Sequence, residues 1–425
     1  MGSPKKFSIR DGWCAEGVHF EDFEKICRDM AYSTIYIESG FDNLDVLSFK
    51  EFGQDDTPVW FELTGETIER FEKTGSITGG AAVSYPGITN AALRQELEES
   101  GTKMMLNILN DPTVGPYLVS SYAFATLPQT FKSTSEFARE PGLCRDVGIK
   151  RNLMRLGNTK KCTLVARKMS GMCKIFAVMA GGSPGIPMTV LSEAAKNILK
   201  EEQYGHPDLI GWHADHAVTE ITFEFPDLAV SDGMPEKLIP GVVFRNSDIG
   251  RSSLTVLGTV RKDSADESVV ITKKTKAHTK RFANGEDFLR RSFEEAMSDT
   301  GRFFRKIREL GKETVCPEAD LRTEAGRTGN RNALNALIRR YASGSSLNTY
   351  LGTDGAIAFV KTAVEERLDP AQRYTAADVV LTLFSVPDIL IMDDRLRNME
   401  NIRTACGNIP FVNPVKAPKK EAIAS

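Results

Sequence analysis

The sequence predicts an α+β fold, in which a curved antiparallel sheet packs on helices and a helical portion follows towards the C-terminus. Three observations support this prediction. Segments with the alternating pattern of half-buried strands gather between about residues 115 and 262. Helical periodicity precedes and follows them, without the strand–helix succession of a parallel sheet. The chain of 425 residues is long enough for one large core or two modest ones.

The N-terminal part mixes short helical and strand-like segments. A helix is expected over residues 20–30, a strand over 59–63, and a second helix over 67–74, which Gly75 ends. The following stretch to residue 90 contains many Gly, Ser and Pro residues and is interpreted as a loop or domain junction. Asn90 is expected to cap a helix that continues to about Leu109.

The central part contains the clearest hairpin of the sequence. Residues 162–168 and 172–179 alternate in polarity, and Ser170-Gly171 between them suits a two-residue turn. The neighbouring elements are expected to be a strand at 117–126, one or two helices within 133–156, a helix at 190–200 and a strand at 218–228.

A second hairpin is expected within residues 240–261, PGVVFRNSDIGRSSLTVLGTVR. Its two apolar strands flank Asn246, Ser247, Asp248 and Gly250, whose short side chains and positive-φ tolerance favour a turn. These tip residues have two interpretations: they only form the turn, or they contact a ligand or a neighbouring subunit.

The NSDIG hairpin followed by an arginine resembles the central signature of the phage/plasmid-like proteins called domain of unknown function 932. Residues 174–199 and 218–228 are similar to other parts of that family, and about residues 100–410 are covered by the resemblance. The charged segment 262–271, expected to be irregular, departs from the family pattern. The resemblance implies kinship with mobile elements and a bacterial host cell, and assigns no activity.

The C-terminal part is expected to be helical. Asn284 is a candidate cap for a long amphipathic helix ending near Gly311. Shorter helices are expected at about 330–343, 353–368 and 375–386, with Thr353 and Thr375 as caps. The regions predicted are an acidic N-terminal region at 1–89, an α+β core domain at 90–312, a helical region at 313–412 and a disordered tail at 413–425.

Composition indicates a soluble cytoplasmic protein. No run of about 18 apolar residues is present and the first residues lack the apolar core of a secretory signal, so neither a membrane span nor export is expected. The seven cysteines are odd in number, scattered and without a CxxC pair, which favours free thiols in a reducing compartment.

Charge is distributed unevenly along the chain. Residues 1–147 carry 13 Lys and Arg against 23 Asp and Glu, whereas residues 148–425 carry 41 against 34. No acidic residue occurs between Val147 and Ile175, and cations dispersed in this way suit successive phosphates of a nucleic acid, with aromatic rings to stack on unpaired bases. The candidate nucleic-acid-binding residues are Lys150, Arg151, Arg155, Lys160, Lys161, Arg167, Lys168, Lys174, Phe176 and Phe282.

Signals for metal or cofactor binding are weak. His213 and His216 have the spacing of a metal-binding pair on a helix, with Glu220 as the best candidate for a third ligand, but surface or capping positions before a strand are the favoured interpretation. The glycines at 181–185 match neither a Walker A loop nor a dinucleotide-binding motif, so no cofactor is expected. No catalytic residue is assigned.

Three functions follow from these observations. The first is a phage- or plasmid-related nucleic-acid-binding protein that prefers single-stranded DNA, acts in recombination or replication, and forms homo-oligomers. The second is a non-catalytic, self-assembling protein, in which the acidic N-terminal third of one subunit meets the basic region of the next. The third is a metal-dependent hydrolase that uses His213 and His216.

Overall fold

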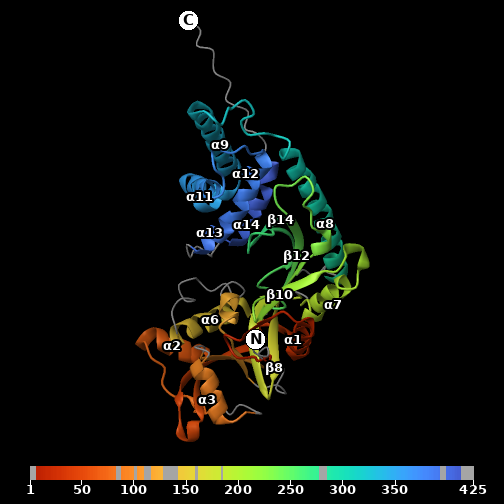
Figure 1. Ribbon diagram of the computed structural model, residues 1–425. Coiled ribbons are helices and arrows are strands. Elements are labelled where there is room, and N and C mark those ends of the chain that lie inside the picture. Colours follow the sequence, from red (N-terminus) through yellow and green to blue (C-terminus); the bar gives the residue numbers. More distant parts are fainter. Residues whose placement is uncertain are drawn as a thin grey trace.

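The computed structural model confirms the predicted fold class: antiparallel strands and helices are mixed, and the C-terminal portion is helical (Figure 1). The strands divide between two sheets. The structure describes residues 6–82, 88–99, 103–109, 116–127, 142–157, 161–182, 185–276, 285–392 and 399–412. Within these ranges, no helix has both the length and the apolar character needed to cross a membrane.

The larger sheet has eight strands and takes its strands from the N-terminal and central parts of the chain. All neighbours are antiparallel except β7 and β9, which are parallel. One face packs on α2 (Gly65–Thr74) and α6 (Leu143–Leu156) through buried residues such as Ile68 and Leu153. The strand order is β2 (Thr34–Gly40), β8 (Lys161–Met169), β9 (Met172–Ala180), β7 (Tyr117–Val119), β6 (Met104–Ile108), β3 (Leu44–Phe52), β4 (Pro58–Glu62) and β5 (Ala81–Ala82).

The smaller sheet has six strands, each antiparallel to its neighbours. One face packs on α1 (Phe20–Ser33), α7 (Met188–Ile198) and α8 (Gly285–Leu310). The same core cluster includes Val165 and Phe176 of the larger sheet, so the two sheets share one apolar core. The strand order is β1 (Cys14–Gly17), β10 (Asp208–Asp215), β11 (Thr219–Glu224), β12 (Leu238–Asn246), β13 (Leu254–Lys262) and β14 (Ser268–Lys276).

The C-terminal helices form a second core with the last turns of α8 and with β14, at the end of the molecule away from α2 and α3 (Figure 1). A charged contact joins them to the smaller sheet, because Glu400 pairs with both Arg245 and Lys273. The helices are α9 (Glu324–Gly344), α10 (Leu347–Leu351), α11 (Thr353–Glu365), α12 (Ala376–Thr382), α13 (Val386–Met392) and α14 (Met399–Asn408).

Predictions that depended on local turn and cap chemistry are confirmed. Ser170 and Gly171 have φ of 50° and 82°, as a tight turn between β8 and β9 requires. Gly75 ends α2 in the left-handed conformation, with φ of 69°. Thr375 caps α12 in a reciprocal capping box with Asp378. The apolar stripe expected along α8, including Leu289 and Phe293, is buried.

The helix expected over residues 90–109 is wrong in its second half. The helix α3 (Asn90–Glu99) is short, and Met104–Ile108 forms strand β6 inside the larger sheet. Four of the five β6 residues are buried, so the segment has no alternation that would distinguish a strand from a buried helix.

Other boundaries also differ from the prediction. Residues 117–126 contain the three-residue strand β7 followed by a 3₁₀ turn. Half of the segment 262–271, expected to be irregular, is strand: its first residue ends β13 and its last four begin β14, with a turn at 263–267 between them. Thr353 does not cap α11, because it is the first helical residue and Gly352 precedes it. The helix α6 lies within the range 133–156, where one or two helices were expected. Asn284, residues 133–141 and the tail from residue 413 lie outside the described residues.

The N-terminal region does not form a structural unit of its own. Strand β1 pairs with β10 in the smaller sheet, whereas β2 pairs with β8 in the larger sheet. The boundary predicted at residue 89 therefore separates strands that belong to common sheets. Removal of residues 1–75 would take strands from both sheets, so it is not a clean test of assembly.

Thr375→Ala should lower the free energy of unfolding by about 1 kcal/mol, because the side chain that caps α12 is lost. The matched control is Thr353→Ala, which removes an exposed threonine that has no capping role. Urea denaturation of both variants measures the difference. Equal destabilisation by the two substitutions would contradict the role assigned to Thr375.

Candidate functional site

The tip of the β12–β13 hairpin is buried between the two sheets. Asn246, Ser247 and Asp248 are at most 1% exposed. Asp248 accepts a hydrogen bond from Arg167 Nη2 of β8 at 2.7 Å and another from Thr34 Oγ1 of β2 at 3.1 Å. The tip of the smaller sheet is therefore fastened to the larger sheet. Because of this burial, the prediction that the tip contacts a ligand or another subunit is wrong.

Arg167 extends this network to His216. Its Nη1 donates to His216 Nδ1, and His216 Nε2 lies 2.9 Å from the carbonyl oxygen of Arg10. An acceptor at Nδ1 and a donor at Nε2 define the neutral tautomer with its proton on Nε2. Burial, reinforced by the positive charge of Arg167, lowers the pKa of His216 to about 2. The histidine therefore stays neutral in the folded protein.

Aromatic rings enclose the two side chains. The Arg167 guanidinium lies 4.8 Å from the centroid of the Phe176 ring, a distance typical of a cation–π contact. The rings within 6.1 Å of the His216 ring, centroid to centroid, are those of Phe7, Trp13, Tyr122 and Phe176. This enclosure excludes solvent from the ion pair and strengthens its electrostatic attraction.

Three buried polar atoms around this network have no hydrogen-bond partner among the described residues: the Tyr36 hydroxyl, Arg167 Nε and Asn246 Oδ1. Burial raises the pKa of Tyr36, and the nearby carboxylate of Asp248 adds to the effect. Such atoms are rare in folded proteins because each loses its bonds to water. The junction is therefore an unusually polar part of the core.

A second buried ion pair lies on the neighbouring strand. Lys174 Nζ of β9 is 2.7 Å from Asp11 Oδ1 and also pairs with Glu96 of α3. Asp11 in turn accepts a hydrogen bond from the backbone N–H of Ser121 at 2.8 Å. Lys174 thus ties the N-terminal segment and α3 to the centre of the larger sheet.

The predicted nucleic-acid-binding residues are divided by these contacts. Arg167, Lys174 and Phe176 are fully buried, and Lys150 is mostly buried against Asp45. None of these four side chains is free to contact a phosphate or a base, so their assignment to an interface is corrected. The prediction was wrong for these residues because the carboxylates that pair with the cations of this acid-free stretch lie far away in the sequence.

The remaining candidates lie at the surface but do not form one patch. Arg151 pairs with Glu72 at 3.0 Å, while Arg155, Lys161 and Lys168 are exposed. Lys161 and Lys168 lie seven residues apart near opposite ends of β8, which places them about 23 Å apart. Lys160 and Phe282 lie outside the described residues.

The histidines proposed as metal ligands do not form a site. His213 lies on β10 and His216 in the turn after it, so the helical spacing that suggested the pair does not apply. Both ring nitrogens of His216 are engaged, and Glu220 pairs with Arg245. Among the described residues, no three His, Cys, Asp or Glu side chains are placed to bind a metal ion.

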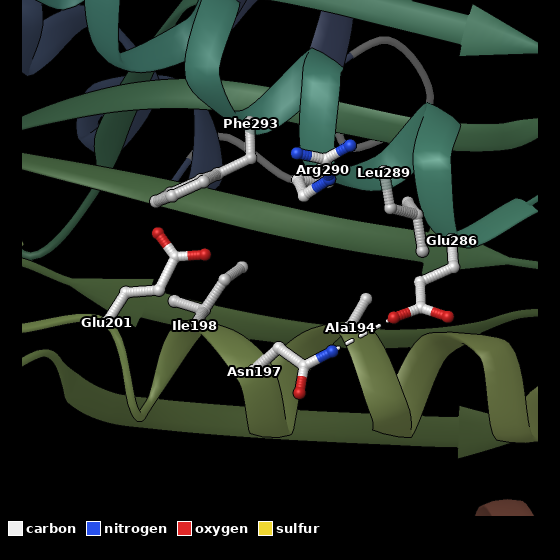
Figure 2. A pocket seen from close by; sticks show the side chains of 8 residues that line it. All are labelled: Ala194, Asn197, Ile198, Glu201, Glu286, Leu289, Arg290 and Phe293. Carbon is white, nitrogen blue, oxygen red and sulfur yellow. Dashed lines mark hydrogen bonds between the residues drawn. The ribbon is translucent and has the colours of Figure 1, made fainter.

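A small open cleft lies between α7 and α8 (Figure 2). Its floor is apolar and includes Ile198 and Phe293, and its rim carries Glu201 and Glu286. Asn197 donates to Glu286 at 3.0 Å, and Gln203 donates to Glu201 at 3.0 Å. Both rim carboxylates therefore have partners, and the cleft presents no catalytic pair.

A group of exposed cations that the sequence reasoning did not select lies on α9. Arg327, Arg331 and Arg339 are exposed, and none has a carboxylate at salt-bridge distance among the described residues. Glu324 is the single acidic residue within the helix. The signal was present in the sequence as four arginines and one glutamate in a helical segment.

The comparisons with known proteins identify no relative. No family model, curated protein or solved structure matches the chain. The resemblance seen at the NSDIG hairpin therefore stays a prediction.

Arg167→Met should destabilise the fold by about 3–5 kcal/mol, because it leaves Asp248 buried without its cationic partner. The control is Lys168→Met at the next position, where the side chain is exposed and a change within about 0.5 kcal/mol is expected. Chemical denaturation of the two variants measures both values. A mild effect of Arg167→Met would show that the junction does not depend on this ion pair.

His216 should make stability fall as the solution becomes acidic. Its pKa in the folded protein is about 2, below the value of about 6.5 in an unfolded chain, so only the unfolded state gains a proton between these values. The stability advantage of the wild type over His216→Gln should be complete above pH 6.5. Below that pH it should shrink by about 1.4 kcal/mol per pH unit.

His213 provides a control of opposite sign. A hydrogen bond to Asp215 raises its pKa, so the protonated form favours the folded state. The advantage of the wild type over His213→Gln should be largest below pH 6.5 and disappear as the pH rises through the pKa of the folded state. Urea denaturation from pH 5 to 8 tests both variants. The same pH trend for both would contradict the two assignments.

Proposed function

We propose that the protein binds nucleic acid and that the exposed face of α9 is its main contact surface. The observation that carries this proposal is the set of unpaired arginines on that face, Arg327, Arg331 and Arg339. Binding to a phosphate backbone draws much of its free energy from released counterions, which requires accessible cations. A cation already held by a carboxylate contributes less, because that pair must first be broken.

The charge balance of each helix supports the choice of α9, because α8 carries six acidic and six basic residues whereas α9 carries one acidic residue and four arginines. Four arginines of α8, Arg291, Arg302, Arg305 and Arg308, also have no carboxylate partner among the described residues, but acidic side chains are interspersed among them. On α8, Arg290 lies within 4 Å of both Asp287 and Glu294, and Lys306 is 3.3 Å from Glu309. On α11, Lys361 pairs with Glu365 at 3.4 Å. These pairs follow helical spacing and are typical of an ordinary solvated surface. On α9 the one carboxylate at such spacing is Glu324, three residues before Arg327, and the two do not lie at salt-bridge distance.

The single-strand preference expected from the sequence loses part of its basis. It relied on Phe176 and Phe282 as stacking platforms, and Phe176 is buried against Arg167 and His216. The proposal therefore keeps nucleic-acid binding and moves the interface to α9. Recombination or replication is the proposed setting, since the hairpin resemblance implies kinship with mobile elements.

The test is fluorescence anisotropy with labelled single-stranded DNA, duplex DNA and RNA at several salt concentrations. The triple variant Arg327→Ala, Arg331→Ala, Arg339→Ala should weaken binding and reduce the slope of log affinity against log salt by about 2–3. The matched control replaces Arg155, Lys161 and Lys168, which are exposed cations elsewhere, and should bind like the wild type. Loss of binding in the control alone would transfer the interface to the central strands, and no binding by the wild type at low salt would end the proposal.

A further inference from the structure

The solvent-facing side of α9 carries an ordered set of side chains, Thr328, Arg331, Asn332, Asn335 and Arg339, which we term the α9 stripe. At 3.6 residues per turn these five positions fall within about 100° of the helix circumference. Four of them are exposed and Asn335 is partly exposed. Along the axis, the stripe extends for about 17 Å.

The rest of the fold fixes which way the stripe faces. Leu334, Ile338 and Tyr341 are buried in the C-terminal core, on an arc of the helix that begins about 20° beyond Arg331. Asn330, also buried, donates to the carbonyl oxygens of Pro370 and Gln372 at 2.8 and 2.9 Å. The helix is thus anchored by one face and presents the other at the outer end of the molecule (Figure 1).

The two asparagines of the stripe have no structural role in the described part of the chain. Unlike Asn330, neither Asn332 nor Asn335 forms a hydrogen bond there. Asparagine is a poor residue for a helix interior, because its side chain competes with the backbone for hydrogen bonds. Two asparagines on the exposed face therefore lower the stability of the helix, and no hydrogen bond in the described part of the chain compensates for this. Their side-chain amides are thus available to bind a ligand.

We propose that the α9 stripe reads base edges in the major groove of duplex DNA. This inference rests on the proposed function and adds the class of nucleic acid and the mode of recognition. Arginine pairs with guanine and asparagine with adenine through two hydrogen bonds each, and a threonine methyl suits thymine. The major groove, about 12 Å wide, admits one α-helix.

The length and composition of the stripe fit this role. Its length of about 17 Å corresponds to about five base pairs at a rise of about 3.4 Å. The stripe contains no lysine, whose compact point charge suits phosphates, and both of its cations are arginines with a planar fork. Arg327 lies about 40° beyond Arg331 near the N-terminal end of the helix, where it is exposed and could contact a phosphate next to the groove.

A single strand fits the stripe less well. Proteins that bind unpaired strands stack the bases on exposed aromatic rings. The stripe has no aromatic residue, and Tyr341 of the same helix is 2% exposed. Duplex DNA is therefore the occupant that the side chains of α9 favour.

The test uses a pool of DNA duplexes with twelve randomised base pairs, incubated with the full chain and sequenced after several rounds of selection. Enrichment of a short motif of about five base pairs is the expected result. In Asn332→Ala and Asn335→Ala, discrimination at one position of that motif should fall about tenfold. Thermal stability should rise in the same variants, since alanine is the better helix former, so unfolding would not explain the loss.

The controls are Asn348→Ala on α10 and Arg291→Ala on α8, both off the stripe, and both should keep the wild-type motif. Binding without an enriched motif, or tighter binding of single-stranded DNA or RNA than of the duplex pool, would overturn this inference. In either case, sensitivity to the arginine triple variant would leave the proposed function intact. Failure to bind any of the three nucleic acids would remove both.

Discussion

The ion pair between Arg167 and Asp248 is the contact on which the arrangement of the two sheets depends. It joins β8 of the larger sheet to the hairpin tip of the smaller sheet, and both side chains are at most 1% exposed. A buried pair of this kind contributes little net stability when intact, but losing one partner is costly. The pair therefore contributes mainly to the specificity of the fold. It favours the arrangement of the two sheets in which Arg167, Asp248, Thr34 and His216 all have hydrogen-bond partners.

Pairing within the chain also accounts for the uneven charge along the sequence. Acidic residues of the N-terminal third meet basic residues of the central part at Asp11–Lys174, Asp45–Lys150, Glu72–Arg151 and Glu24–Lys196. Part of the asymmetry that suggested subunit assembly is therefore satisfied inside one molecule. Cations without such a partner among the described residues, those of α9 included, remain to attract an anionic ligand.

Local chemistry made part of this structure predictable from the sequence. The turn at Ser170-Gly171, the end of α2 at Gly75 and the cap at Thr375 follow from residues within a few positions of each other. Strand β6 was mistaken for helix because burial on both faces removes the periodicity. The burial of Arg167 was not predictable in this way, since its partner Asp248 lies 81 residues away. The stripe on α9 was not predicted because its arginines are spaced apart in the sequence and form no dense cluster. The scarcity of acidic residues in the same segment was the signal that could have indicated it.

The division of the first strands between two sheets has a consequence for synthesis of the chain. Strand β1 at residues 14–17 pairs with residues 212–215, and β2 at residues 34–40 pairs with residues 161–167. At about 5–20 residues per second, the ribosome releases these partners about 6–40 s after the strands that need them. Until then, the backbone N–H and C=O groups of β1 and β2 have no partner strand in the nascent chain. They can therefore pair with non-native strands. The N-terminal strands therefore complete their sheets only after more than a hundred further residues have been made.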